Sequence, residues 1–341
     1  MIYRSRAPLR IGLAGGGTDV SPYSDEFGGA ILNTTISKYA LASIEPIEEN
    51  GIILQALDRK EEQRFEWSSE LPINGTLDLL KGVYNRIQKD YGLPLTNFRL
   101  STYVDAPAGS GLGTSSTLVV AIVGAFTEML KLPLREYDIA HYAFEIERHD
   151  LGLAGGKQDQ YAATFGGVNF MEFYGGDKVI VNPLRIKQEY LSELENNLVL
   201  YFTATSRESA TIIKEQQKNV LDKNEKSIEA MHQLKEQARM MKEALLKGRL
   251  HEFGEVLDFG FQQKRKMAHN ISNGHIETIY EAAKKAGATG GKISGAGGGG
   301  FMTFYCPGNT RYKVIETLNT FGGEVKPYQF TSHGLTTWTI K

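Results

Sequence analysis

The sequence Asp105-Ala-Pro-Ala-Gly-Ser-Gly-Leu-Gly-Thr-Ser-Ser-Thr117 joins two segments of different character. Before it, residues 98–104 (FRLSTYV) alternate and are rich in β-branched and aromatic side chains, which predicts a strand. After it, residues 118–126 (LVVAIVGAF) are apolar on every side, which predicts a helix that is buried all round. A glycine loop that leads into a helix directs unpaired backbone N–H groups and the positive end of the helix dipole at one point. This arrangement suits a phosphate group, although from these residues alone a ligand-free turn is the alternative.

Composition narrows the class of protein. A length of 341 residues favours about two domains, and the net charge of −2 gives no electrostatic reason to expect binding to nucleic acid or to an anionic membrane. The one cysteine, Cys306, excludes an internal disulfide framework and lies in an apolar run. Because no signal peptide and no apolar run of membrane-spanning length are seen, we expect a soluble, cytoplasmic protein.

The sequence predicts both helices and strands in each half of the chain. The first part reads as a strand meander followed by helices over 77–91, 114–131 and 135–150. A change in composition after the predicted strand 179–181 places a domain boundary near residue 185. The second part reads as helices with an antiparallel sheet, an α+β pattern. We therefore expect an N-terminal domain over 1–185 and a C-terminal domain over 186–341.

Several polar residues stand beside glycines or at helix ends. Arg10 and Asp19 flank the loop Ala14-Gly-Gly-Gly-Thr-Asp19, Glu147 lies at the edge of an apolar helix stripe, and Asp159 follows paired glycines at the start of a short helix. Each residue taken singly also has an ordinary structural explanation: a solvated Arg, an Asx turn, a surface Glu and a first-turn acid. Their significance therefore depends on the motifs around them.

Familiar nucleotide-binding patterns do not fit. Residues 295–300 match G-x-G-x-x-G, but these glycines lead directly into a predicted strand, whereas the dinucleotide fingerprint leads into a helix. No Walker A sequence is present, and the HRD and DFG elements of protein kinases are missing. A nucleotide site here is therefore neither a P-loop, a Rossmann nor a protein-kinase site.

Three motifs together resemble those of the GHMP kinases, a family of small-molecule kinases. Residues 7–19 (APLRIGLAGGGTD) resemble the N-terminal substrate motif, 107–116 the phosphate loop with Thr114 in place of its first Ser, and 292–301 the C-terminal glycine motif. The resemblance spans residues 5–301 and implies the two-domain GHMP kinase α+β fold. Its N-terminal domain would be ribosomal-S5-domain-2-like and its C-terminal domain ferredoxin-like.

The N-terminal motif is most similar to that of the D-glycero-D-manno-heptose 7-phosphate kinases, with the fucokinases as the nearest alternative. Galactokinases carry a Glu-His pair where this chain has Gly16 and Gly17. The departure implies an altered sugar pocket.

The resemblance also implies roles for individual residues. Asp159 would take the proton from the anomeric hydroxyl, Arg10 would pair with it and steady the transferred phosphoryl group, and Ser115 with Glu147 would hold Mg²⁺. ATP binding is assigned to Pro107, Ala108, Gly109, Ser110, Gly111, Leu112, Gly113, Thr114, Ser115 and Ser116. Substrate binding is assigned to Gly16, Gly17, Thr18, Asp19, Lys157, Arg207 and Gly297. Among these, Lys157 and Arg207 are candidates for a second anion site, with a solvated surface cation as the alternative for each.

The reaction implied is transfer of phosphate from ATP, with Mg²⁺, to the anomeric hydroxyl of heptose 7-phosphate, on the route to nucleotide-activated heptose for surface glycans. The alternatives are a kinase for an unphosphorylated sugar such as L-fucose or galactose, and an inactive sugar or nucleotide sensor on the same fold. Many members of the family form dimers, so a homodimer is an open expectation. The sequence specifies no interface.

Overall fold

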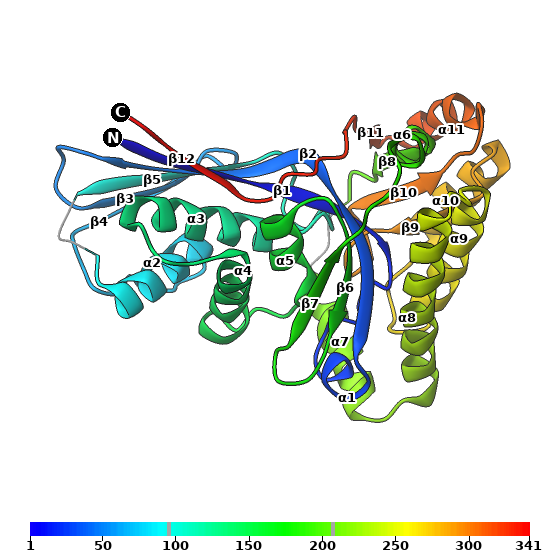
Figure 1. The fold of residues 1–341 in the computed structure, drawn as a ribbon, viewed down its shortest axis with the longest axis horizontal. Helices are drawn as coiled ribbons and strands as arrows, with labels where there is room; N and C mark the ends of the chain where they lie inside the picture. Colours follow the sequence, from blue (N-terminus) through cyan, green and yellow to red (C-terminus); the bar gives the residue numbers. More distant parts are fainter. Residues whose placement is uncertain (94–96, 206–208) are drawn as a thin grey trace.

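The computed structural model describes residues 1–93, 97–205 and 209–341. Figure 1 shows two parts that meet in the middle of the molecule, each built from a sheet and helices packed on it. The structure has the α+β character predicted from the sequence.

The larger sheet lies in the first part and contains eight strands of the described chain. Its main order is β12 (Thr336–Ile340), β1 (Ile2–Ala14), β2 (Gly29–Pro46), β5 (Phe98–Val104), β3 (Ile52–Ala56) and β4 (Glu61–Phe65), while β6 (Val168–Phe173) joins β2 and β7 (Val179–Pro183) joins β6. Only β3 and β5 are parallel among these pairs. β2 is long enough to pair twice, with β6 through its first half and with β5 through its second half.

Helices cover one face of this sheet (Figure 1). They are α2 (Asp78–Tyr91), α3 (Thr114–Leu130), α4 (Glu136–Glu145) and α5 (Gln158–Phe165). The apolar middle of α3 is fully buried against β1 and β2, so the prediction of a helix surrounded by protein is confirmed. The predicted helix over 135–150 changes character, because α4 gives way to a π-helical turn over Ile146–Asp150.

The second part contains a smaller antiparallel sheet with the order β11 (Glu324–Val325), β8 (Leu198–Phe202), β10 (Phe301–Tyr305) and β9 (Gly290–Ile293). Its helices are α6 (Gln188–Asn197), α7 (Ser209–Leu221), α8 (Glu225–Leu246), α9 (His251–Lys264), α10 (Gly274–Ala286) and α11 (Thr310–Leu318), followed by a 3₁₀ turn over Asn319–Phe321. The sequence did not predict β9. Its two glycines are needed for packing, since a Cβ at Gly290 would lie 1.8 Å from the Gly254 carbonyl oxygen of α9.

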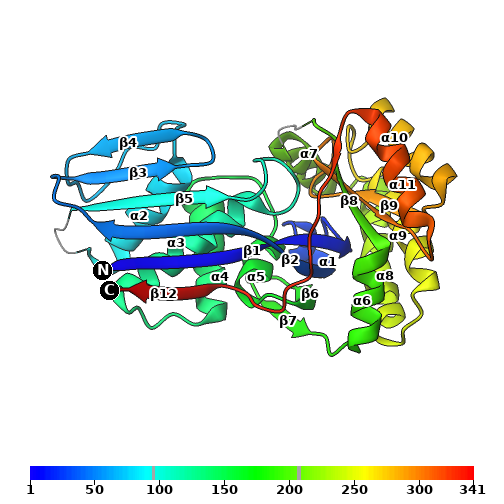
Figure 2. The same cartoon turned by 90° about the horizontal axis from the view of Figure 1, so that it is seen from above.

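The two ends of the chain lie side by side in the larger sheet (Figure 2). β12 pairs with β1 from Arg6↔Thr336 to Ile2↔Ile340. The predicted boundary near residue 185 falls between β7 and α6, but the last strand returns to the first part of the molecule. Within the described ranges, no helix combines the length and apolar character needed to cross a bilayer.

A short helix absent from the sequence prediction links the two parts. This helix, α1 (Tyr23–Phe27), follows the N-terminal glycine loop. Its Tyr23 is fully buried and belongs to the same core cluster as Met231 and Phe261 of the second part, and its hydroxyl lies 2.8 Å from His232 Nδ1. The N-terminal motif is thereby packed against both parts of the molecule.

Candidate active site

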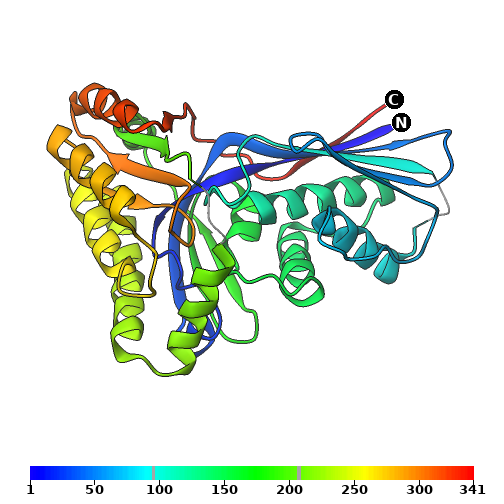
Figure 3. The ribbon, with the colours of Figure 1, turned by 180° about the vertical axis from the view of Figure 1, so that it is seen from behind.

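A cavity of about 580 Å³ lies where the two parts meet. Figure 3 views this junction from behind, with the helices of the first part to the right and those of the second part to the left. The first part contributes the end of β1, the two glycine loops 15–20 and 108–116, and residues 147–159. The second part contributes α7, the end of α9 and the glycine motif 292–296. All three motifs singled out in the sequence therefore face one space.

Two of the glycine loops are in direct backbone contact. Gly109, Gly111 and Gly113 all have left-handed φ values, of 71°, 83° and 80°, which glycine adopts readily. At Gly111 a Cβ would lie 2.7 Å from the carbonyl oxygen of Ser294, so a side chain would separate the loops. Gly113 is the N-cap of α3, and within the described chain no side chain caps this helix start. Its first N–H groups are thus available to an anion in the cavity.

Seven of the ten residues predicted to bind ATP line the cavity. The other three do not: Pro107, Ser110 and Leu112. Ser110 and Leu112 are fully buried, and the Ser110 carbonyl accepts a hydrogen bond of 2.9 Å from the Phe301 amide. Gly109, Gly111 and Gly113 therefore face the cavity, while the residues between them are buried and fix the loop to the protein.

Ser115 and Glu147 lie together at the start of α3. Ser115 Oγ donates a hydrogen bond of 2.8 Å to Glu147 Oε1, and Gln160 Nε2 donates one of 2.6 Å to Glu147 Oε2. Glu147 is fully buried, and the π-helical turn carries it toward α3. Hydroxyl and carboxylate oxygens are the donors that Mg²⁺ prefers, so these residues fit the metal that the family resemblance implies.

Arg10 and Asp159 form a partly buried ion pair. Arg10 Nε and Nη2 both lie 2.6 Å from Asp159 Oδ1, and Arg10 also donates to the Gly111 carbonyl of the phosphate loop. A register shift between Pro8 and Arg10 marks an irregularity of β1 at this point, a feature that re-aims side chains. The Asp159 side chain is 22% exposed against 4% for Arg10, so the carboxylate has a face that a ligand can reach.

Asp19 is placed next to this pair. Its Oδ2 accepts a hydrogen bond of 3.0 Å from the Gln158 amide. Burial raises the pKa of Asp19, and the neighbouring Asp159 carboxylate raises it further, whereas the Gln158 amide and Arg10 act in the opposite direction. Gly156 makes the approach possible, because a Cβ there would lie 1.9 Å from Asp19 Oδ2.

The other residues of the N-terminal loop have different positions. Gly16 and Gly17 line the cavity, and Gln216 Nε2 of α7 donates a hydrogen bond of 2.8 Å to the Gly17 carbonyl. Thr18 is fully buried away from the cavity lining, and its hydroxyl bonds to the Gly15 and Ala30 carbonyls at 2.8 and 3.0 Å. Thr18 therefore holds the loop in shape.

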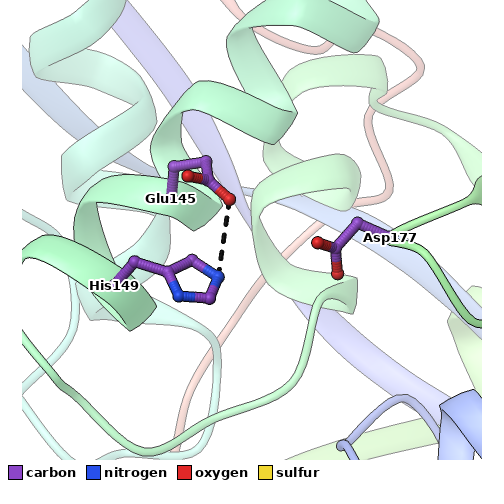
Figure 4. Close-up of side chains that lie close together, drawn as sticks. All are labelled: Glu145, His149 and Asp177. Atoms are coloured by element: carbon purple, nitrogen blue, oxygen red, sulfur yellow. Dashed lines mark ion pairs between the residues drawn. The ribbon is translucent and has the colours of Figure 1, made fainter.

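The structure does not bring Lys157 into the cavity. Its Nζ lies 2.8 Å from Asp177 Oδ1 and 3.5 Å from Asp25 Oδ1, and this ammonium is the largest cause lowering the pKa of Asp177. Figure 4 shows Asp177 facing the pair formed by Glu145 and His149. None of these three residues lines the cavity. Because Lys157 already neutralises Asp177, this cluster carries no metal assignment.

Of the remaining predicted substrate residues, Gly297 does not line the cavity. Gly297 is turned to the second core, where a Cβ would lie 2.7 Å from the Ile271 carbonyl oxygen. Arg207 lies outside the described residues. The second anion site predicted from Lys157 and Arg207 is thus not formed by Lys157.

Sequence reasoning missed two cations that the fold places here. Lys264, at the end of α9, donates a hydrogen bond of 2.6 Å to the Gly295 carbonyl, and Lys292 donates one of 2.7 Å to the Gly12 carbonyl. Burial lowers the pKa of Lys264 to about 8, with Arg10 acting in the same direction and Asp19 against it. Lys264 had no local signal, because it lies in a helix of mixed charge far from any motif.

Comparisons with known proteins agree with this geometry. Residues 78–167 match the model of the GHMP kinases N-terminal domain, and residues 241–323 match that of the GHMP kinases C-terminal domain. The D-glycero-alpha-D-manno-heptose 7-phosphate kinase of Campylobacter jejuni is 48% identical over 337 residues, 99% of each chain. The bifunctional fucokinase/GDP-fucose pyrophosphorylase of Arabidopsis thaliana is 28% identical over 86% of this chain and 29% of its own length.

A solved structure gives the same result. The crystal structure of a D-glycero-D-manno-heptose 1-phosphate kinase from Bacteroides thetaiotaomicron superposes with a TM-score of 0.85 at 46% identity, covering 99% of each chain. Both family models, a near full-length relative and the three motifs around one cavity lead to one assignment. The chain belongs to the GHMP kinases, a family of ATP-dependent phosphotransferases.

Proposed function

We propose that this protein transfers the γ-phosphoryl group of ATP to the anomeric hydroxyl of D-glycero-D-manno-heptose 7-phosphate, giving the 1,7-bisphosphate and ADP. The observation that carries the proposal is the Arg10–Asp159 pair, which lies against the phosphate loop in a chain 48% identical to a kinase of that name. The product would serve the synthesis of nucleotide-activated heptose for surface glycans.

Asp159 is the proposed general base. Its Oδ1 is held by Arg10, and among the contacts of the described residues Oδ2 has no part in that pair. Oδ2 accepts the proton of the anomeric hydroxyl as its oxygen bonds to the γ-phosphorus, and the bond from that phosphorus to the β–γ bridging oxygen breaks. Arg10 holds the Asp159 carboxylate in place through this ion pair and stabilises the phosphoryl group in transfer.

The phosphate loop and the Ser115–Glu147 pair are proposed to hold the nucleotide. The N–H groups at the start of α3 face the cavity without a side-chain cap in the described chain, so they suit the ATP phosphates. Ser115 and Glu147 would hold Mg²⁺, which neutralises charge on the phosphates during transfer. Asp19 would accept hydrogen bonds from sugar hydroxyls, as its position beside Asp159 allows.

The following experiment determines which carbon of the sugar substrate already carries a phosphate. The C. jejuni relative is named for a heptose 7-phosphate, whereas the B. thetaiotaomicron structure is described as a heptose 1-phosphate kinase. ADP release would be measured with ATP and Mg²⁺ against heptose 7-phosphate, heptose 1-phosphate, mannose 6-phosphate, L-fucose and galactose. Phosphorus NMR of the product would show which hydroxyl received the phosphate.

We expect turnover with heptose 7-phosphate and a new anomeric phosphate resonance. Asp159→Asn should lower kcat by about 100-fold or more, because the base is lost. Asp177→Asn, which removes a carboxylate outside the cavity, is the matched control and should retain kcat. Turnover of free L-fucose would favour the fucokinase alternative. Turnover of heptose 1-phosphate alone would mean that the substrate already carries its phosphate at C1 and that another hydroxyl receives the new one. ATP binding without turnover of any sugar would favour a sensor.

A further inference from the structure

Two buried lysines of the cavity wall have only main-chain partners. Lys264 Nζ bonds to the Gly295 carbonyl and Lys292 Nζ to the Gly12 carbonyl, and their residues are 5% and 7% exposed. Among the residues that the structure describes, no carboxylate lies within ion-pair distance of either ammonium, whereas Arg10 and Lys157 both have one. Within the described chain, these two buried ammonium groups therefore form no direct ion pair.

A buried charge of this kind calls for an anion. Removing an ammonium from water is costly unless it is paired, and a carbonyl oxygen satisfies one of its three donors without cancelling its charge. The burial is expressed in the pKa of Lys264, lowered to about 8, and in the pKa of Lys292, lowered well below its ordinary value. A ligand that brings negative charge into the cavity supplies the missing partner.

Lys264 is the better placed of the two for an anion on the sugar side. It faces Gly16 of the N-terminal loop, where an added Cβ would lie 3.7 Å from Nζ and touch no other described group. The charged side chains that act on the pKa of Lys264 are Arg10 and Asp19, which both belong to the proposed sugar site. Glycine at position 16 thus leaves the ammonium open toward the space where a sugar would lie.

We infer that Lys264 binds the phosphate group that the sugar substrate already carries. The inference rests on the proposed function and names the cation for which Lys157 and Arg207 were the sequence candidates. The ATP phosphates have their own place at the start of α3, next to Ser115 and Glu147. The ligand class is a phosphomonoester of a sugar, bound by an ammonium that retains its bond to the Gly295 carbonyl.

The test compares Lys264→Met and Lys264→Arg with a matched control, Lys266→Met. Lys266 is an exposed lysine two residues away that bonds to Gln263 outside the cavity. Kinetics would be measured with heptose 7-phosphate and with the same heptose lacking the phosphate, and circular dichroism would check folding. We expect Lys264→Met to raise the KM for heptose 7-phosphate by about 10- to 100-fold, with the KM for ATP within about twofold.

The pattern across substrates separates binding from other roles. Lys264→Arg should recover most of the affinity because it keeps the charge, and Lys266→Met should match the wild type. An equal loss for the phosphorylated and unphosphorylated heptose, or an equal rise in the KM for ATP, would overturn the inference, because Lys264 would then act on the reacting centre or on the nucleotide.

A second measurement keeps this inference distinct from the proposed function. Calorimetry without ATP would record binding of heptose 7-phosphate and mannose 6-phosphate to the wild type and to Lys264→Met. If the wild type fails to turn over heptose 7-phosphate but binds sugar phosphates in a Lys264-dependent way, the proposed function is wrong and the subsite stands. If sugar phosphates bind both proteins equally, or bind neither, the subsite is wrong whatever the activity.

Discussion

At the scale of single residues, Lys264 links the site to protein stability. Its side chain is buried, and its pKa of about 8 lies well below the ordinary 10.5 of lysine. The charged groups that act on it are Arg10 and Lys292, which repel it, and Asp19, which attracts it. A residue held at a cost to stability is typical of functional sites, where binding a ligand repays that cost.

We predict that the effect of Lys264→Met on stability depends on pH. Between pH 8 and 10.5 the unfolded chain binds a proton at Lys264 that the folded chain does not, so wild-type stability rises with pH across this window. The penalty is present in full below pH 8 and disappears toward pH 10.5. Methionine carries no charge and removes this penalty. The free energy of unfolding of the variant minus that of the wild type should therefore be about 2 to 3 kcal/mol larger at pH 7 than at pH 10.

Urea unfolding of both proteins at pH 7 and pH 10 measures this difference. Lysine makes the hydrogen bond to Gly295 whether charged or neutral, and methionine loses it at both pH values. Its contribution therefore drops out when the effects at pH 7 and pH 10 are subtracted. Lys266→Met is the control, and the difference should be near zero for this exposed residue. Equal effects of Lys264→Met at the two pH values would mean that the ammonium is hydrated in the folded protein.

At the scale of elements, the π-helical turn over Ile146–Asp150 determines where Glu147 points. A π-turn is wider than an α-turn, and here the Leu151 amide bonds to the Ile146 carbonyl at 3.0 Å. Gln160 of α5 then fixes the Glu147 carboxylate and also donates to Ser116 Oγ at 3.1 Å. The proposed metal ligand is thus oriented by two elements besides its own.

We predict that Gln160→Met weakens Mg²⁺ binding, so that more Mg²⁺ is needed for half-maximal activity, without abolishing turnover. The side chain is of similar size but donates no hydrogen bond, so Glu147 loses its orientation, and outer-shell losses of this kind typically cost about 10- to 100-fold in metal affinity. Activity would be titrated with Mg²⁺ at saturating ATP and sugar. Gln233→Met, which removes a comparable bond to Glu229 on α8, is the control. An unchanged Mg²⁺ midpoint would contradict the role given to Gln160.

Sequence patterns predicted elements where the cause was local. The glycine loop, its flanking strand and α3 follow from residue types over 98–130, and the structure confirms all three. The π-turn was missed because apolar spacing over 139–146 is the same for an α-helix that continues. Lys264 was missed because its partner Gly295 is brought to it by the fold of the second part, not by any nearby residue.

At the scale of the whole molecule, β1 connects the chain's end to the candidate active site. The strand begins beside β12, at Ile2↔Ile340, and carries Arg10 and Gly12 to the cavity. Leu335, just before β12, packs on Gly124 of α3, where a Cβ would lie 2.8 Å from Leu335 Cδ1. The pairing of β12 with the first part could not be predicted, because a short alternating pattern predicts a strand but not the strand with which it pairs.

We predict that removing residues 335–341 destabilises the protein and disturbs the site. Without β12, the backbone groups of β1 from Ile2 to Arg6 become an unpaired sheet edge, and α3 loses the Leu335 contact. The midpoint of thermal unfolding should fall by several degrees, since a loss of 1 kcal/mol lowers it by about 2–4 °C in a protein of some 150–250 residues and by less in a larger one. Removing Lys341 alone, which lies beyond β12, is the control and should leave the midpoint unchanged.

Kinetics of the truncated protein distinguish two ways in which β12 matters. Arg10 lies on the same strand as the lost pairing, so a shift of β1 should lower kcat by weakening the Arg10–Asp159 contact, while the nucleotide loop at the start of α3 should keep the KM for ATP close to normal. A protein with a lower unfolding midpoint but unchanged kcat below that temperature would show that β12 stabilises the sheet without positioning Arg10. A rise in the KM for ATP alone would instead place the disturbance in α3, through Leu335 and Gly124.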